Sequence, residues 1–564
     1  MSTTGTVLTA CLLPTRDKIM INGTTPAMAE FMHSLPNARW HGGRRAWTCD
    51  ATPAAAWRIA SLNPSGPYEL DDELSLMVCK FLQQIRNSQA ITLLSEFPQP
   101  TLRNLDSWPH QVAAYHFAAS SDAALLDMWM GTGKTKVVVD LIVNTHALRT
   151  LILCPCSVRS VWRREIERHA AKHVETLILD KGTTKQKTHS FLRVLESRHR
   201  AGAISLAMPL VVVINYETAR MEPFARESLN INWDMVVLDE SHRVAMPTTQ
   251  ISKHVAKLGL RAERRLCLTG TPMRNGPLDL FGQFRFLERG IFGTSWHHFR
   301  NRYAVYNRFI PQKIDGYKNQ EELRERVRLL TFSASKEVLD LPGCSHNLRT
   351  VELSPKSRKT YCALRDELIA DLESGVVRAA NALTRLLRLQ QVTAGFVGGV
   401  DDGTGETSLV EVGTEKADSL SDLFADIDPD DPVVVFSTFR HDLDIVRDTA
   451  CRCGRRYGEL SGRQNDLTPE GTMPEWSNVL GVQYQSGGVG VDLTRARYAV
   501  YFTPTFSRSN YDQSISRLHR PGQKREVICY RLVASGTVDE LVYRALESKR
   551  EVIESVLEGL TSAR

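Results

Sequence analysis

The chain has 564 residues, of which 42% are hydrophobic and 24% are charged. This is the composition of an ordinary globular protein with room for several domains, and the formal net charge of +6 permits a polyanionic partner without requiring one. The apolar runs fall short of the about 18 residues that a membrane span needs, and the first residues lack a secretory leader, so we expect a cytoplasmic protein without membrane contact. The 11 cysteines form no C-x-x-C pair, which favours reduced thiols over a zinc site.

Residues 26–62 predict a small α+β module. In ARWHGGRRAWTC (38–49), Trp40 and Trp47 flank a Gly-Gly turn as in a β-hairpin, and helical patterns precede and follow it. Aromatic and arginine side chains on a hairpin are typical of a nucleic-acid platform. The alternative is a module whose tryptophans form its core and whose arginines are solvated, and the composition favours neither.

Buried parallel strands are predicted in two clusters further along the chain. Each run is apolar and ends at a polar residue, a glycine or a proline, and the intervals are long enough for crossover helices. The first cluster comprises AALLDMWM (123–130), LRTLILCP (148–155), LVVVIN (210–215), MVVLDES (235–241) and RRLCLTGTP (264–272). The second comprises DPVVVFST (431–438), NVLGVQYQSG (478–487), YAVYFTP (498–504) and VICYRLVAS (527–535). The fold class is therefore α/β, with two doubly wound parallel-sheet lobes.

The segment DMWMGTGKTK (127–136) predicts a phosphate-binding loop between a strand and a helix. Met128 stands where the usual pattern has a glycine. Backbone amides of the loop would cradle phosphates, Lys134 would neutralise the β/γ oxygens, and the Thr135 hydroxyl would hold Mg²⁺. The loop residues expected around the nucleotide are Met130, Gly131, Thr132, Gly133, Lys134 and Thr135. The alternative is a glycine-rich turn with an incidental lysine.

Adjacent carboxylates follow the apolar run of MVVLDESH (235–242). Asp239 would bind Mg²⁺, and Glu240 would orient and deprotonate the attacking water. An acidic pair after a strand is also a common helix N-cap. The occurrence of GTGKT earlier in the chain favours the nucleotide site.

Two further motifs carry candidate residues. Thr269-Gly270-Thr271 ends a predicted strand and would face the ligand crevice. Arg517 and Arg520 are three apart, so we expect them on one helical face, where they would stabilise charge on the leaving γ-phosphoryl group. An isolated R-x-x-R is otherwise a solvated basic face.

The order of GTGKT, DESHR, LTGTPMRN, SGGVGVDLT and QSISRLHRPGQ resembles the Swi/Snf-type ATPases of helicase superfamily two. The resemblance covers roughly residues 100–560, and in this family the first position of the phosphate loop is not restricted to glycine. The hairpin region resembles the HARP module of annealing helicases in the same family. At 332–333, Phe332 and Ser333 stand near the place where the family usually has an arginine pair.

The resemblance implies roles for residues outside the phosphate loop. Gln111 of WPHQ (108–111) would read adenine, and Gly490 and Asp492 would link the nucleotide and DNA sites. Thr269 and Thr271 would couple hydrolysis to lobe movement. The residues expected on the DNA backbone are Ser437, Thr438, Ser486 and Gly487.

We therefore expect a chain of five parts. These are a HARP-like αββα module (1–65), a helical connector (66–100), a first RecA-like lobe (101–292), a helical protrusion and linker (293–410) and a second RecA-like lobe (411–564). The expected activity is that of an ATP- and Mg²⁺-dependent motor that translocates on duplex or branched DNA in a bacterial or virus-infected cell. The alternatives are a strand-separating helicase, a DNA-binding scaffold on an inactive motor, and an ATPase that displaces a DNA-bound protein.

Overall fold

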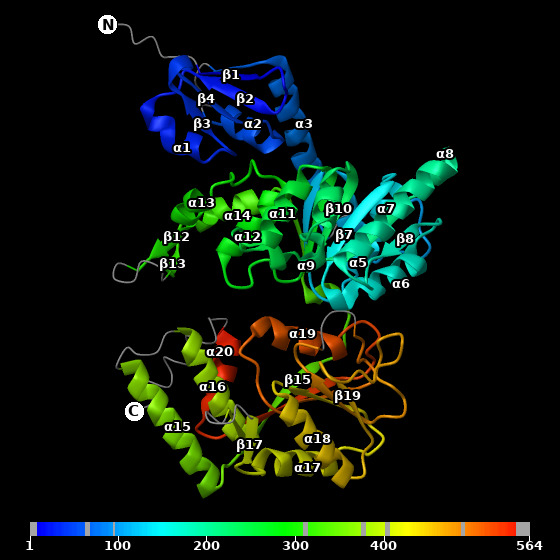
Figure 1. Cartoon of the computed structure of the whole chain (residues 1–564), viewed down its shortest axis with the longest axis vertical. Helices are drawn as coiled ribbons and strands as arrows, with labels where there is room; N and C mark the ends of the chain where they lie inside the picture. The colour runs from blue at the N-terminus through cyan, green and yellow to red at the C-terminus, as the bar shows by residue number, and fades with distance from the viewer. Residues whose placement is uncertain are drawn as a thin grey trace. The chain divides into compact units, whose positions relative to one another are not determined.

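The computed structural model describes residues 8–62, 68–93, 96–307, 314–373, 379–400, 407–486 and 491–548. The chain divides into two compact units, Met1–Val338 and Leu339–Arg564 (Figure 1). Within the described ranges, every helix is too short or too polar to cross a membrane.

The first unit begins with the expected small α+β module. Its strands β1 (Leu8–Leu12), β2 (Lys18–Asn22), β3 (Arg39–His41), β4 (Ala46–Asp50) and β5 (Tyr68–Leu70) form one sheet in the order β3-β4-β2-β1-β5. Helices α1 (Ala29–His33), α2 (Pro53–Ala60) and α3 (Asp72–Gln89) accompany the sheet. The hairpin β3–β4 is confirmed, with Trp40 opposite Trp47.

The two tryptophans of the hairpin have different environments. Trp47 is buried in the module's core, whereas Trp40 is 48% exposed and the neighbouring arginines of the turn are exposed. The module also extends past the expected boundary at residue 65. Strand β5 pairs with β1, and Leu74 and Val78 of α3 pack into the same core, because an amphipathic helix must bury its apolar stripe against a neighbour.

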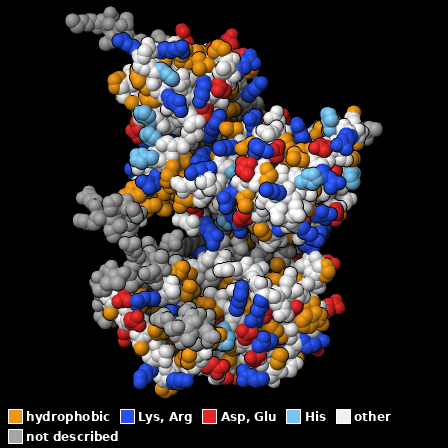
Figure 2. All heavy atoms as spheres, viewed as in Figure 1, with side chains coloured by type: hydrophobic (Ala, Val, Ile, Leu, Met, Phe, Trp, Pro, Cys, Tyr) orange, Lys and Arg blue, Asp and Glu red, His pale blue; other side chains and the backbone are white. Residues whose placement is uncertain are grey.

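The first lobe is built on a seven-stranded parallel sheet in the order β14-β6-β11-β10-β7-β9-β8. The five predicted runs form β6 (Ala123–Met128), β7 (Arg149–Cys154), β9 (Leu210–Asn215), β10 (Trp233–Asp239) and β11 (Ala262–Thr269); β8 spans Glu175–Ile178. The flanking helices are α4 (Pro109–Ala119), α5 (Lys134–Asn144), α6 (Arg159–His169), α7 (Thr184–Ala201), α8 (Ala203–Leu206), α9 (Tyr216–Ala219), α10 (Phe224–Leu229), α11 (Gln250–Gly259) and α12 (Leu280–Leu287). Figure 2 shows basic side chains spread over the module and the lobe among acidic and apolar ones.

The expected protrusion at 293–410 is not one segment. Its first part, with α13 (Trp296–Tyr303), β12 (Ala304–Tyr306), β13 (Ile314–Tyr317) and α14 (Gln320–Arg328), belongs to the first unit. Strand β14 (Thr331–Ala334) pairs with β6 and so completes the sheet of the first lobe. The remainder, with β15 (Cys344–Val351), α15 (Pro355–Glu373) and α16 (Ala379–Ala394), belongs to the second unit.

The second lobe has a six-stranded parallel sheet in the order β15-β22-β21-β18-β20-β19. The four predicted runs form β18 (Val433–Ser437), β20 (Val479–Gln483), β21 (Tyr498–Tyr501) and β22 (Val527–Ala534), and β19 spans Tyr457–Leu460. The helices are α17 (Glu415–Asp426), α18 (Arg440–Arg452), α19 (Arg508–Leu518) and α20 (Val538–Ser548). At the end of the expected protrusion and linker, β16 (Phe396–Val400) and β17 (Thr407–Glu411) pair as antiparallel strands. The two-lobed α/β fold is confirmed.

Candidate active site

The phosphate loop follows β6, and α5 begins at its lysine. Gly131 and Gly133 both have φ of 81°, a left-handed conformation that favours glycine. A Cβ atom on Gly133 would lie 2.2 Å from Nε2 of Gln111, so a side chain there would displace the Gln111 amide from its hydrogen bond to Thr132. The loop therefore favours glycine at 133, although Met128 occupies the place of the first glycine and is buried at the end of the strand.

Lys134 is held against the loop. Its Nζ donates hydrogen bonds to the carbonyl oxygens of Met128, at 2.7 Å, and Trp129, at 3.3 Å. Burial raises the pKa of Asp127, and the positive charge of Lys134 opposes this shift. The ammonium group thus lies against the carbonyl groups at the end of β6 and the start of the loop, and its role in binding phosphate stays a prediction.

Two side chains of WPHQ support the loop from α4. Gln111 donates from Nε2 to the carbonyl oxygen of Thr132, at 3.0 Å, and accepts from the backbone amide of Trp108, at 3.0 Å. The ring of His110 contacts the same carbonyl through Nε2, at 2.9 Å. His110 was not singled out from the sequence. The adenine-reading role of Gln111 stays a prediction, whereas its contact with the phosphate loop is observed.

The acidic pair lies at the end of β10. Burial raises the pKa of Asp239 to about 7, and the charge of Glu240 raises it in the same direction, whereas the hydrogen bond from Trp162 opposes the shift. Trp162 Nε1 donates to Asp239 Oδ2 at 3.0 Å, and the Tyr216 hydroxyl donates to the Asp239 carbonyl at 2.8 Å. Trp162 comes from α6, and a buried tryptophan within an amphipathic helix gives no sequence signal of this contact.

The backbone conformation and the buried carboxylate of Glu240 are both unusual for a residue that serves only in packing. Its φ is 52°, a left-handed conformation that is uncommon for a side chain with a Cβ. Its Oε2 atom is buried and accepts no hydrogen bond from the described residues. His242 Nδ1 lies 3.5 Å from this oxygen and 3.3 Å from the Thr269 hydroxyl. Unpaired buried polar atoms and backbone strain both concentrate at functional sites.

Residues 269–271 join the phosphate loop to the acidic pair. Strand β11 lies between β6 and β10 in the sheet, so its end lies between theirs. A Cβ atom on Gly270 would lie 3.1 Å from the carbonyl oxygen of Met128. The backbone amide of Thr271 donates to the Thr269 hydroxyl at 3.0 Å, and the Thr271 hydroxyl is buried without a described partner. The structure thus brings together all the first-lobe candidates.

The arginine motif of the second unit is arranged differently from the prediction. Arg517 lies in the last turn of α19, but the helix ends at Leu518, so Arg520 does not share its face. The reason is Pro521, because a proline disfavours helical conformation in the residue before it. Arg520 Nη1 instead donates to the Val491 carbonyl at 3.2 Å, and the Arg517 carbonyl accepts from the Leu493 amide at 3.0 Å.

The other described candidates of the second unit have the following contacts. Asp492 Oδ1 accepts from the amide and the hydroxyl of Thr494, at 3.0 and 2.7 Å. Thr438 donates from its hydroxyl to the Pro504 carbonyl at 3.0 Å, whereas the side chain of Ser437 is buried and Ser486 is partly exposed. Gly487 and Gly490 lie outside the described residues.

The glycine-rich loop connects a strand to a helix, and the acidic pair ends a second strand, with one strand, β11, between the two. This is the architecture of P-loop nucleotide-binding proteins. The family model of the SNF2-related domain matches residues 67–394, and that of the helicase conserved C-terminal domain matches residues 415–522. The chain belongs to the SNF2-related family.

Known proteins share this similarity at low sequence identity. An uncharacterized ATP-dependent helicase of Mycoplasma pneumoniae is 24% identical over 439 residues, which cover 76% of this chain and 39% of the relative. The DNA repair and recombination protein RAD54-like of Gallus gallus is 23% identical over 476 residues, covering 76% of this chain and 63% of the relative. The solved SWI2/SNF2 ATPase core of Sulfolobus solfataricus in complex with dsDNA has a TM-score of 0.39 and 21% identity, covering 83% of this chain and 96% of that chain. The chain thus spans from about two fifths to just under two thirds of the length of these two curated relatives.

Proposed function

We propose that this protein is a DNA-dependent ATPase that translocates along duplex DNA and remodels branched DNA. The observation that carries the proposal is the buried Oε2 atom of Glu240, which accepts no hydrogen bond from the described residues and lies beside Asp239 and across β11 from the phosphate loop. A general base needs an acceptor oxygen that is not committed to a hydrogen bond, and this oxygen has only the longer, 3.5 Å contact with His242 Nδ1.

The residues present fit ATP and Mg²⁺. Gly131 and Gly133 hold the loop in a conformation from which its backbone amides would cradle phosphate oxygens, and Lys134 brings a positive charge to the same loop. Thr135 and Asp239 would hold Mg²⁺ through hard oxygen ligands, and the ion when bound neutralises charge on the phosphates. Glu240 would orient the attacking water and accept its proton, and Arg517 and Arg520 of the second lobe would contact the γ-phosphoryl group.

Membership of the SNF2-related family and similarity to a DNA repair and recombination protein support DNA as the partner. The exposed Trp40 and the arginines on the β3–β4 hairpin support the finer proposal of branched DNA, since an exposed aromatic ring can stack on an unpaired base. Displacement of a protein bound to DNA is compatible with the same motor.

The test is steady-state ATP hydrolysis by the wild type and by Glu240→Gln, without DNA and with single-stranded, duplex and forked DNA at one salt concentration, because phosphate contacts depend on salt. We expect duplex or forked DNA to stimulate the wild type and Glu240→Gln to lower turnover by roughly 100-fold or more, the loss of a general base being worth about 10²–10⁴-fold.

Glu263→Gln is the matched control, because Glu263 is an exposed residue of β11 and the substitution makes the same chemical change. It should hydrolyse ATP like the wild type. Absence of stimulation by any DNA would contradict the proposal and favour a DNA-binding scaffold or an ATPase activated by a protein.

A further inference from the structure

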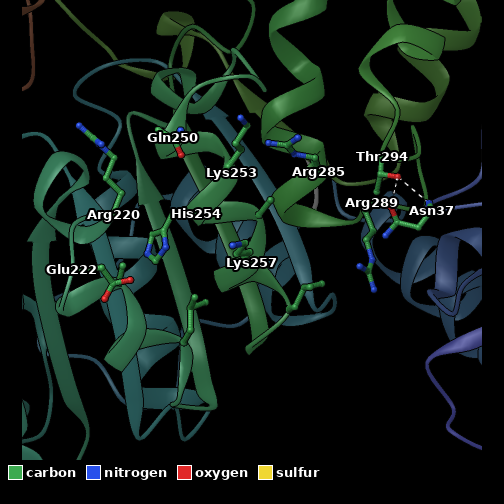
Figure 3. Close-up of a pocket in the computed structure, with 14 residues that line it drawn as sticks. Asn37, Arg220, Glu222, Gln250, Lys253, His254, Lys257, Arg285, Arg289 and Thr294 are labelled. Atoms are coloured by element: carbon green, nitrogen blue, oxygen red, sulfur yellow. Dashed lines mark hydrogen bonds between the residues drawn. The ribbon is translucent and has the colours of Figure 1, made fainter.

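A basic groove lies on the first unit between α11, α12 and the N-terminal module. It has a volume of about 610 Å³, and five cationic side chains line it together with a single carboxylate, that of Glu222. The cations are Arg220, Lys253, Lys257, Arg285 and Arg289. In Figure 3, Gln250, Lys253, His254 and Lys257 extend from one helix, and Arg289 and Thr294 lie close to Asn37 of the module.

Two of these cationic side chains, Arg289 and Arg285, already have partners within the protein. Arg289 forms an ion pair with Asp50 at 2.8 Å, and Arg285 donates to the Pro247 carbonyl and the Ser252 hydroxyl, both at 3.1 Å. Burial lowers the pKa of His254 to about 4, so this ring adds no charge at neutral pH.

The remaining three cations, Arg220, Lys253 and Lys257, are exposed. In the part of the chain that the structure describes, none of them forms an ion pair. The charge of Arg220 is partly balanced by Glu217, whose pKa it helps to lower, but Lys253 and Lys257 leave a net positive surface, which attracts a polyanion.

The groove is distinct from the nucleotide site. Its floor includes Leu229 and Leu260, which precede the starts of β10 and β11 at Trp233 and Ala262. The phosphate loop and the acidic pair instead follow the carboxyl ends of β6 and β10, which are the other ends of the strands in the same sheet. A ligand in the groove therefore does not occupy the nucleotide crevice.

A second hollow, on the module, adjoins the groove at Asn37. This hollow of about 340 Å³ is lined by Arg39, His41 and Arg44 of the hairpin, and Asn37 lines both hollows. The Asn37 amide donates to the Thr294 hydroxyl at 2.9 Å, and that hydroxyl donates to Asn37 Oδ1 at 3.0 Å, which fixes the junction. The exposed Trp40 belongs to the same hairpin.

We propose that the basic groove and the hairpin hollow, which have Asn37 in common, together bind the phosphodiester backbone of a single-stranded arm of branched DNA. The inference rests on the proposed function, and it names a second DNA site on the motor. Lys253 and Lys257 lie about 6 Å apart along α11, close to the rise of two nucleotides in a strand at roughly 3.4 Å each, so each ammonium group can neutralise a separate phosphate. An extended track of two hollows suits a polymer, and an exposed tryptophan suits a base that is not paired.

The test is the affinity of Lys253→Glu/Lys257→Glu for a fluorescent fork with single-stranded arms and for a blunt duplex of equal length, measured by anisotropy without nucleotide. Both lysines are exposed, so the variant should fold. We expect fork binding to weaken by roughly tenfold or more and the slope of log K against log salt concentration to fall in magnitude by about 1.4–1.8, since each of the two lost phosphate contacts removes about 0.7–0.9. Binding of the blunt duplex should change by less than about threefold.

Lys181→Glu/Lys185→Glu makes the same charge change at exposed lysines outside the groove and should bind the fork like the wild type. Equal weakening by this control, or unchanged fork binding by the groove variant, would overturn the proposal. If the groove variant instead loses binding of a poly-glutamate peptide while fork binding is retained, the groove accepts an acidic protein segment and the DNA assignment is wrong.

The same variant separates this inference from the proposed function. Its hydrolysis of ATP with saturating blunt duplex should stay within about twofold of the wild type, because the groove residues do not contact the nucleotide site. If no DNA stimulates the wild type but fork binding depends on Lys253 and Lys257, the motor proposal fails and the groove stands. If DNA stimulates hydrolysis by the wild type but fork binding does not depend on Lys253 and Lys257, the motor proposal stands and the groove proposal fails.

Discussion

Gly133 is the residue on which the geometry of the phosphate loop depends most. With a φ of 81°, alanine at this position would strain the backbone, and its Cβ, 2.2 Å from Gln111 Nε2, would force the Gln111 side chain to move. We predict that Gly133→Ala lowers kcat/KM for ATP by roughly 100-fold, because a displacement of about 1 Å in a positioning element can have an effect of that size. ATP hydrolysis and binding of a fluorescent ATP analogue would be measured on the same preparation.

Gly316→Ala is the control for this prediction, since no atom lies within 4 Å of the added Cβ. It should retain full activity. Normal nucleotide binding by Gly133→Ala would mean that Gln111 moves aside without disturbing the loop, and the structural role assigned to this contact would then be wrong.

Sequence reasoning found the site residues that motifs fix and missed those that tertiary contacts supply. Lys134, Asp239 and Thr269 follow apolar runs, and parallel strands bring their carboxyl ends to one sheet edge, so their proximity could be predicted. Trp162 and His110 contribute through single hydrogen bonds from neighbouring helices. Such contacts depend on helix orientation, which hydrophobic periodicity does not specify.

Among the secondary-structure elements too, those with a strong local sequence pattern could be predicted, whereas those that depend on tertiary pairing could not. Long apolar runs predicted nine strands that the structure contains. The four-residue β14 could not be predicted, because TFSA gains its strand conformation from pairing with β6 more than 200 positions away. The β16–β17 hairpin was missed for a related reason, since its glycines and polar residues are typical of a loop.

The start of α18 provides a test of how a buried carboxyl affects stability. Asp442 Oδ2 accepts from the Phe439 amide at 3.0 Å and the Thr503 hydroxyl at 2.7 Å. Burial raises the pKa of Asp442 to about 7, against the opposing effect of these hydrogen bonds. The unfolded carboxyl titrates near pH 4, so the folded state binds the proton more tightly, and stability falls as pH rises from about 4 to about 7.

We therefore predict that Asp442→Asn, which keeps an acceptor oxygen and removes the charge, is stabilising at pH 8 and near neutral in effect at pH 5. The gain at pH 8 should be about 1–2 kcal/mol, or several degrees in melting temperature, below the ceiling of about 4 kcal/mol that a shift of three pKa units sets.

Asp444→Asn on the same helix should have the opposite sign. Although burial opposes it, the pairing with Arg463 holds the pKa of Asp444 below its usual range. Melting curves of the full chain between pH 5 and pH 8 would check both variants. A pH-independent difference between Asp442→Asn and the wild type would contradict the assignment.

At the scale of the whole molecule, the N-terminal module is not a separable appendage of the first lobe. Arg58 of α2 donates to the carbonyl oxygens of Gly290, at 3.0 Å, and Ser34, at 3.2 Å, and so links the two parts. Phe81 and Ile85 of α3 belong to the core of the lobe, whereas Leu74 and Val78 of the same helix belong to the core of the module. Deletion at residue 65 would therefore expose apolar surface, and point variants are better probes of the module.

Gly293 is the most direct of these probes. Its φ is 76°, and an added Cβ would lie 2.2 Å from the Ser34 carbonyl oxygen of the module. Gly202 has a φ of 79° with no atom within 4 Å, so Gly202→Ala reports backbone strain alone, worth about 1–2 kcal/mol.

We predict that Gly293→Ala lowers the melting temperature by several degrees more than Gly202→Ala, because the clash forces module and lobe apart in addition to straining the backbone. It should also speed hydrogen exchange in α2 and in residues 288–294, where the Arg58 hydrogen bond would be lost. Equal melting temperatures and unchanged exchange would mean that the segment shifts without undocking. If Gly293→Ala undocks the module but leaves duplex-stimulated hydrolysis intact while fork binding weakens, then the junction at Asn37, and not the hairpin alone, positions the DNA arm.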